Sequence, residues 1–270
     1  MDYNQFLYML DPIAKWLHII AGVTWIGLLY FFNFINGHVA ATMESDTKKK
    51  VFPELMPRTL YWFRWGAAWT WVTGIVLLYV IFWHGSLSMG ESAGNYMFEG
   101  GTEVTYWAHI MLLVTFMSVF IYDFIYKSAL AKNVRLVTII SLLLIFGVEY
   151  LMIHCGQFSY RAFNIHIGAM FGSMMAFNVW FRIWPAQQKI ITAIRDGETP
   201  DGDLVALAGL RSKHNTYLSV PLIWTMINEH TVVFSGKLCG CTGLVLAIVI
   251  PLGWHIVFQL YKKSAKVKGF

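Results

Sequence analysis

Residues Trp16–Gly27, with the sequence WLHIIAGVTWIG, form an apolar run that carries a single histidine. In a helix His18, Gly22 and Trp25 share one face, at positions i, i+4 and i+7, so the imidazole has bare backbone beside it and an indole below it. This face suits a flat cofactor ligated by histidine. It equally suits a close contact with another helix, because glycine lets a neighbour approach. A histidine inside such a run is a functional hypothesis by default.

The rest of the chain extends this pattern into an integral membrane protein. Of its 270 residues 57% are hydrophobic and only 13% are charged, whereas a soluble domain carries about a quarter charged residues. We expect an all-α bundle of about seven transmembrane helices, forming one domain over residues 1–270, because seven apolar runs reach the ~20 residues needed to cross hydrocarbon. The expected spans are about 12–36, 59–83, 104–127, 135–155, 162–184, 216–235 and 239–261.

The distribution of basic residues predicts the orientation of these spans. Of the 20 lysines and arginines, 17 fall in the segments after spans 1, 3, 5 and 7 or just inside the adjoining spans, and only Lys15, Arg161 and Lys237 fall on the other side. Cytoplasmic segments carry the excess of positive charge. We therefore expect a periplasmic N-terminus and a cytoplasmic C-terminus in a multi-pass protein of the bacterial inner membrane. The basic loops would face anionic lipid, so no nucleic-acid partner is expected.

This orientation gives each histidine a depth. His18, His109, His154, His166 and His230 all fall near the outer ends of their spans, on five different helices. Histidines from two helices are the usual axial ligands of b-type haem in a helical bundle. We therefore predict one or two haem b groups in this layer, with His18, His109, His166 and His230 as the first candidate iron ligands and Gly22 and Trp25 against the cofactor.

Two other interpretations of the histidine layer stay open, a proton or hydrogen-bond network and a copper or zinc site. Covalent c-type haem is excluded from this chain because it has no Cys-x-x-Cys-His motif. Cys155, Cys239 and Cys241 also fall on the outer side and are a possible disulfide set. Glu149 and Glu229 share the outer layer, where a carboxyl group can orient an imidazole or relay protons.

Four stretches together resemble the membrane domain of the bacterial urate hydroxylase/dehydrogenase family. They are LHIIAGVTWIG (17–27), YWFRW with WTW (61–65 and 69–71), HIGAM (166–170) and RSKHNTYL (211–218), and Asn228 and His230 fit the same pattern. The resemblance covers most of the chain in the same order. It adds His214 to His18, His166 and His230 as candidate cofactor ligands, and His154 more loosely.

In that family a cytochrome c domain follows the membrane domain and accepts electrons from urate. The 270-residue sequence has no such domain after its basic tail, so we expect a separate cytochrome c or another periplasmic carrier as the partner, together with membrane lipids and other membrane subunits. The expected function is b-type haem electron transfer, as part of a respiratory complex. The alternatives are an oxidoreductase acting on urate or a quinol, and a non-redox accessory subunit.

Overall fold

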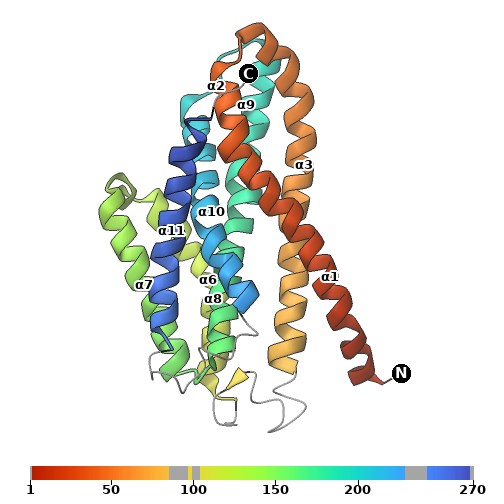
Figure 1. The fold of residues 1–270 in the computed structure, drawn as a ribbon, viewed down its shortest axis with the longest axis vertical. Helices are drawn as coiled ribbons and strands as arrows, with labels where there is room; N and C mark the ends of the chain where they lie inside the picture. The colour runs from red at the N-terminus through yellow and green to blue at the C-terminus, as the bar shows by residue number, and fades with distance from the viewer. Residues whose placement is uncertain (1, 85–96, 99–103, 229–241, 268–270) are drawn as a thin grey trace. The chain divides into compact units, whose positions relative to one another are not determined.

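The structure is a computed structural model and describes residues 2–84, 97–98, 104–228 and 242–267 (Figure 1). These residues are almost entirely helical, and the one β interaction among them is an isolated bridge between Phe98 and Phe158. In chain order the helices are α1 (Tyr3–Tyr30), η1 (Phe31–Asn36), α2 (Gly37–Thr42), α3 (Ser45–Leu77), η2 (Leu78–His84), α6 (Tyr106–Lys127), η3 (Ala129–Lys132), α7 (Val134–His154), α8 (Tyr160–Asn178), η4 (Val179–Ile183), α9 (Trp184–Asp196), α10 (Gly202–Ile227) and α11 (Leu244–Ser264).

Five helical stretches in the described residues are long and apolar enough to cross a membrane. They are Gln5–Thr42, Ser45–His84, Tyr106–Lys127, Val134–His154 and Leu244–Ser264. Their apolar side chains lie outward in large numbers; Val23, for example, is 69% exposed and Leu143 is 65% exposed. Exposed apolar faces of this extent belong in lipid. The all-helical class with several candidate membrane spans is therefore confirmed, while the count of seven spans and their orientation stay predictions.

The two expected spans that are not among these five, at 162–184 and 216–235, correspond to helices with buried polar side chains. In α8 the side chains of Asn164, His166 and Asn178 are fully buried, and in α10 those of Asn215 and Thr216 are. Polar groups of this kind lower the hydropathy of a helix without facing lipid, because neighbouring helices supply their hydrogen bonds. For example, Asn178 donates its amide to Asn215 Oδ1 at 2.8 Å.

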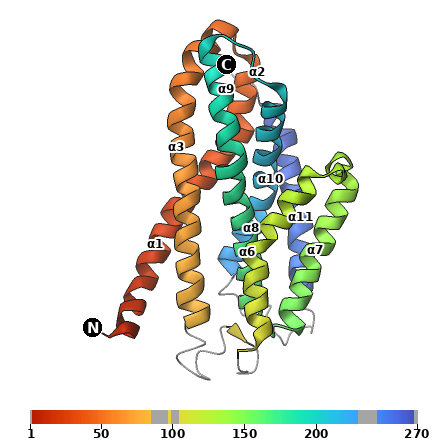
Figure 2. The same cartoon turned by 180° about the vertical axis from the view of Figure 1, so that it is seen from behind.

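The contacts within the chain form two compact units, which are described separately. Unit 1 consists of Met1–Ala14, Gly74–Met174 and Pro221–Leu252. It contains all of α6 and α7, which lie side by side and are joined through the short helix η3 (Figure 2). In this unit α8 approaches α10 at Gly168, where an added Cβ would lie 3.0 Å from Thr225 Cβ. Asn164 Nδ2 donates to the Thr225 backbone carbonyl at 3.0 Å, one turn away from Gly168.

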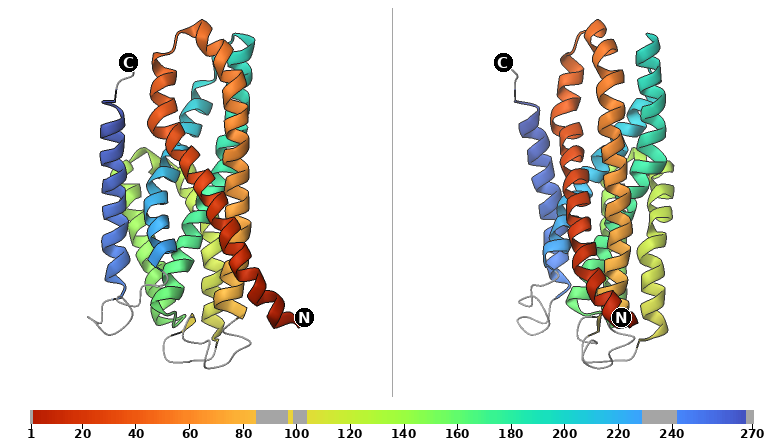
Figure 3. Two further views of the ribbon diagram at one scale, coloured as in Figure 1. Left: turned by 45° about the vertical axis from the view of Figure 1, so that its right-hand side comes forward. Right: turned by 90° about the vertical axis from the view of Figure 1, so that its right-hand side faces the viewer.

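Unit 2 consists of Lys15–Thr73, Met175–Val220 and Gly253–Phe270. Its first segment is a helical hairpin, α1 through α3 (Figure 3). The two arms of the hairpin meet at Gly66, where an added Cβ would lie 3.2 Å from the backbone nitrogen of Trp25. The turn of the hairpin is short, because α2 ends at Thr42 and α3 begins at Ser45. The helix α3 therefore begins well before the expected span at 59–83 and includes Pro53 and Pro57. The organisation as a single domain stays a prediction.

Candidate functional site

In unit 1 two of the predicted histidines lie against one indole. Trp83, near the end of η2, has its ring centroid 6.1 Å from that of His166 in α8 and 5.3 Å from that of His109 in α6. His166 is completely buried and also contacts the rings of Phe82 and Phe158, with centroids 6.3 and 4.7 Å away. We call Trp83, His109 and His166 the indole–histidine cluster. It brings together residues from three helical segments.

The hydrogen bonds of His166 determine which of its nitrogens carries the proton. Its Nδ1 lies 2.6 Å from the backbone carbonyl oxygen of Ala162, one turn earlier in α8. A carbonyl can only accept, so Nδ1 is protonated and the lone pair is on Nε2. Trp83 Nε1–H, which can only donate, bonds that Nε2 at 3.1 Å. Both ring nitrogens therefore have a partner, as a buried imidazole requires.

His109 has the same arrangement on α6. Its Nδ1 lies 3.3 Å from the carbonyl oxygen of Thr105, again one turn earlier, so its Nε2 also carries the lone pair when the ring is neutral. Unlike His166, His109 is exposed on the surface of the protein. The cluster thus presents two imidazoles of the same tautomer, one buried and one exposed.

The π-helical geometry of η2 explains how two consecutive side chains face the same histidine. Residues Leu78–His84 form a π-helix at the end of α3, and both Phe82 and Trp83 are buried against His166. A π-helical turn has more residues than an α-helical one, so it shifts the side chains that follow around the helix axis. Such insertions are common at functional sites.

His18 lies in unit 2 and has a hydrogen-bond pattern of its own. Its Nδ1 is 3.1 Å from Thr73 Oγ1. The Thr73 hydroxyl gives its proton to the carbonyl oxygen of Trp69 at 2.6 Å, so it accepts from His18 Nδ1–H and leaves the lone pair on His18 Nε2. All three described histidines for which we predict iron ligation in the outer layer therefore have the same tautomer.

The other predicted residues of the first span lie around His18 in unit 2. Gly22 faces Thr70 at ordinary van der Waals distance, 3.8 Å for an added Cβ. Trp25 is 1% exposed, and its indole nitrogen is buried without a hydrogen-bond partner in the described part of the chain. An unsatisfied buried donor of this kind is a place where a ligand atom would lower the free energy.

The remaining predicted site residues do not join the cluster in the described part of the chain. His154 is exposed and contacts the ring of Tyr150, with centroids 4.2 Å apart and the ring planes tilted by 44°. His214 lies in unit 2 beside Arg211 and Lys213, and burial together with these two cations lowers the pKa of His214 to about 3. Cys155 forms no disulfide with a described residue. His230, Glu229, Cys239 and Cys241 lie outside the described residues, so their predicted roles stay predictions.

One or two imidazoles are a donor set that a haem can use. Within the described ranges no three His, Cys, Asp or Glu side chains gather as a metal site, and a copper or zinc ion takes three or four such ligands. A porphyrin supplies four nitrogens itself, so one or two imidazoles complete the coordination. A helix carbonyl that holds Nδ1–H is the usual partner that orients such an imidazole. The hydrogen bond from Trp83 Nε1 to His166 Nε2 would have to break before His166 could ligate iron.

The sequence interpretation missed Trp83 and Thr73, the two side chains that bond the predicted histidines. Trp83 is an aromatic residue at the end of an expected span, where aromatics are usually interfacial anchors. The sequence holds only a weak signal for this contact. One apolar run contains a tryptophan, which can donate a hydrogen bond, and other apolar runs contain histidines, which can accept one.

These features define an all-helical chain with candidate membrane spans and with oriented histidines on several helices. A family model described as urate oxidase N-terminal matches residues 4–268, nearly the whole chain. The chain therefore belongs to the urate oxidase N-terminal family, and the resemblance to the membrane domain of the bacterial urate hydroxylase/dehydrogenase family is confirmed. No curated protein and no solved structure matches it.

Proposed function

We propose that this chain is a b-type haem electron-transfer protein of the bacterial inner membrane. It exchanges electrons with a periplasmic cytochrome c and works with other membrane subunits in a respiratory complex. The observation that supports this function best is the indole–histidine cluster: His109 and His166 come from two helices, flank one side chain, and both have Nδ1–H bound to their own helix. An Nε2 atom with a free lone pair is the atom through which a histidine ligates haem iron.

The residues of the cluster have distinct tasks in this proposal. The carbonyl oxygens of Ala162 and Thr105 hold the two imidazoles in the ligating tautomer. Phe82 and Phe158 exclude water from His166, which lowers the local dielectric constant. A bound haem would supply one-electron redox chemistry. His18, held by Thr73 in unit 2, has the tautomer needed for ligation at a second haem site.

Purified protein in detergent tests the proposal through its haem content. The pyridine haemochrome assay should show haem b, and His109→Ala and His166→Ala should each reduce the ratio of haem to protein. The matched control is His255→Ala, because His255 is exposed and bonds only Gln259 among the described contacts. Protein that folds and carries no haem would overturn the proposal.

The family assignment favours a second candidate, an oxidoreductase that acts on urate or a quinol. The family is described as urate oxidase N-terminal, and an enzyme of this kind would take electrons from its substrate at a site on this chain. Adding urate, and separately a quinol, to haem-loaded protein distinguishes the candidates. Reduction of the haem by one of them supports the enzyme, and reduction only by a reduced cytochrome c supports a relay.

The bond between Trp83 and His166 favours a third candidate, a non-redox accessory subunit. It satisfies His166 Nε2 without any cofactor. In that case haem would be absent, and Trp83→Phe would destabilise the protein without a spectral change.

A further inference from the structure

A carboxyl group that the proposed electron transfer does not use is buried in α7. Glu149 is 4% exposed, and its Oε1 is buried without a hydrogen-bond partner among the described residues. It lies five residues before the end of α7 at His154, in a helix that is long and apolar enough to cross a membrane (Figure 1). No basic side chain is in ion-pair contact with Glu149 among the described residues, in contrast to three other acidic residues that have such partners.

Two described residues of unit 1, Gly243 and Tyr160, lie near Glu149. Gly243 lies at the start of α11, where an added Cβ would be 3.6 Å from Glu149 Oε1 and 3.5 Å from Ile153 Cδ1. Tyr160, at the start of α8 and 1% exposed, interacts electrostatically with Glu149 and also interacts with Trp224. Tyr160 is thus the titratable group that faces Glu149 from the helices packed against it in the described part of unit 1.

The free-energy cost of burying a carboxylate determines whether the Glu149 side chain is charged. An isolated carboxylate in a low-dielectric interior costs many kcal/mol, and the group takes up a proton instead. A neutral carboxylic acid costs far less, and it offers an O–H to Tyr160 or to a water. We infer that Glu149 is a membrane-embedded protonation site beside Tyr160, which holds a proton at neutral pH and releases it to water at high pH. This inference does not depend on haem.

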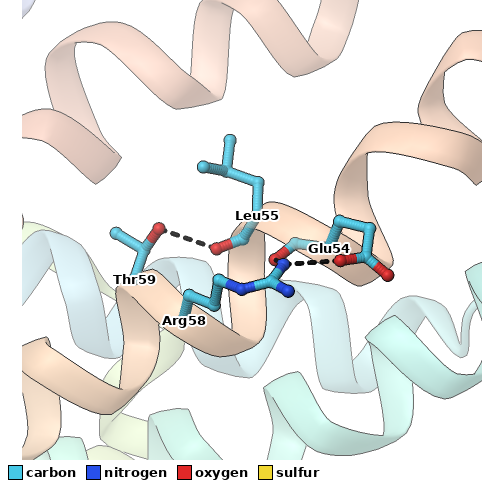
Figure 4. Close-up of polar contacts among 4 residues, drawn as sticks. All are labelled: Glu54, Leu55, Arg58 and Thr59. Atoms are coloured by element: carbon cyan, nitrogen blue, oxygen red, sulfur yellow. Dashed lines mark hydrogen bonds and ion pairs between the residues drawn. The ribbon is translucent and has the colours of Figure 1, made fainter.

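Asp123 of α6 provides the comparison that makes the inference specific. Its side chain is as buried as that of Glu149, at 7% exposure for the residue, but its carboxylate pairs with Lys127 Nζ at 2.9 Å. Glu54 of α3 is the exposed comparison; its side chain is 72% accessible and bonds Arg58 (Figure 4). The three residues therefore differ in burial and pairing. Glu149 is buried and has no cationic partner among the described residues, Asp123 is buried and paired with a lysine, and Glu54 is exposed and paired with an arginine.

Labelling with dicyclohexylcarbodiimide tests the inference, because this apolar reagent reacts with protonated carboxyl groups in apolar surroundings. The full-length protein in lipid nanodiscs is treated at pH 7, and peptide mass spectrometry measures labelling at each acidic residue. We expect at least tenfold more label on Glu149 than on Asp123 or Glu54, and less label on Glu149 as the pH rises to 10. The measurement uses the unmodified protein, so it does not require a variant to fold.

Two results would overturn the inference. One is an unlabelled Glu149, and the other is equal labelling of Glu149 and Asp123, which would show that burial alone determines the reaction. Glu149→Gln supplies the reagent control, since it should remove the label from this peptide and leave the other peptides unchanged. The haem content of the same sample is measured separately, so a failure of the proposed electron transfer is distinguishable from a failure at Glu149.

Discussion

Trp83 donates its indole N–H to Nε2 of His166 at 3.1 Å, while Ala162 holds the opposite nitrogen of the same ring. The imidazole is thus fixed at both ends inside a fully buried site. In the proposed function His166 Nε2 is the atom that ligates iron, so Trp83 occupies that position only in protein without cofactor. The state of the hydrogen bond between Trp83 and His166 therefore distinguishes two roles of His166. The bond is present if His166 is a structural histidine and absent if His166 ligates iron.

Replacing Trp83 tests this distinction. Trp83→Phe keeps an aromatic side chain but replaces the indole by a smaller phenyl ring without an N–H donor, so it leaves a buried acceptor unsatisfied in the haem-free protein. We expect a loss of ~1–2 kcal/mol in the stability of that form and no loss of haem from the loaded form. Thermal unfolding and the ratio of haem to protein measure the two effects. Trp69→Phe is the control, because Trp69 is 58% exposed. If Trp83→Phe lost as much haem as His166→Ala, this would contradict the proposal that Trp83 bonds His166 only in the haem-free protein.

Gly168, two residues after His166, should not tolerate a side chain. An added Cβ would lie 3.0 Å from Thr225 Cβ and 3.1 Å from Met226 Cε, so α8 and α10 would have to separate. Overpacking of this kind costs ~1–3 kcal/mol, and we expect Gly168→Ala to lower the unfolding temperature accordingly. Gly209→Ala is the matched control in α10, since nothing lies within 4 Å of its added Cβ. It should be neutral or stabilising. Equal effects at the two sites would contradict the close contact.

His214 should make the protein less stable in mild acid. Its pKa is lowered from 6.5 to about 3 by burial and by Arg211 and Lys213, so the unfolded chain binds a proton first as the pH falls. The stability is therefore complete above pH 6.5 and declines below it, by ~2 kcal/mol at pH 5. Thermal unfolding of His214→Gln between pH 5 and 8 should lack this part of the pH dependence, whereas exposed His255→Gln should keep it. Identical pH profiles for the wild type and His214→Gln would exclude this role.

The orientation of the chain is testable without any cofactor. Single cysteines placed at Thr47, Lys132 and Lys263, in a background without the three native cysteines, should react with a membrane-impermeant maleimide only after the inner membrane is opened, because these sites are in the basic segments. A cysteine at Ser92 should react in intact spheroplasts. Labelling of Thr47 and Lys263 on opposite faces would exclude the predicted seven-span topology.

Much of the helix pattern followed from the sequence, because apolar runs long enough to cross a membrane have few alternatives. The expected span 104–127 corresponds to α6 at Tyr106–Lys127, and 135–155 corresponds to α7 at Val134–His154. The helix ends next to basic segments were less predictable. The helix α3 begins before its expected span 59–83, and α9 begins where the expected span 162–184 ends. Polar residues outside an apolar run can form helices, but they give no hydropathy signal.

The candidate site could be predicted only in part. Hydropathy and charge identified His109 and His166 at one depth, and both lie in the indole–histidine cluster. The same reasoning had no means to rank them against His154, which is exposed and contacts the ring of Tyr150 instead. The contact with Trp83 depends on the π-helical turn of η2, and this turn has no recognisable sequence signature.

The absorbance spectrum of His166→Ala tests the central claim most directly. The wild-type protein and the His166→Ala and His255→Ala variants are purified in parallel, and their oxidised and dithionite-reduced spectra are compared at equal protein concentration. The proposed function predicts reduced-minus-oxidised bands of b-type haem in the wild type and in His255→Ala, and their loss or a change of ligation in His166→Ala. A haem spectrum unchanged by His166→Ala, or a folded wild-type protein without haem, would contradict the claim.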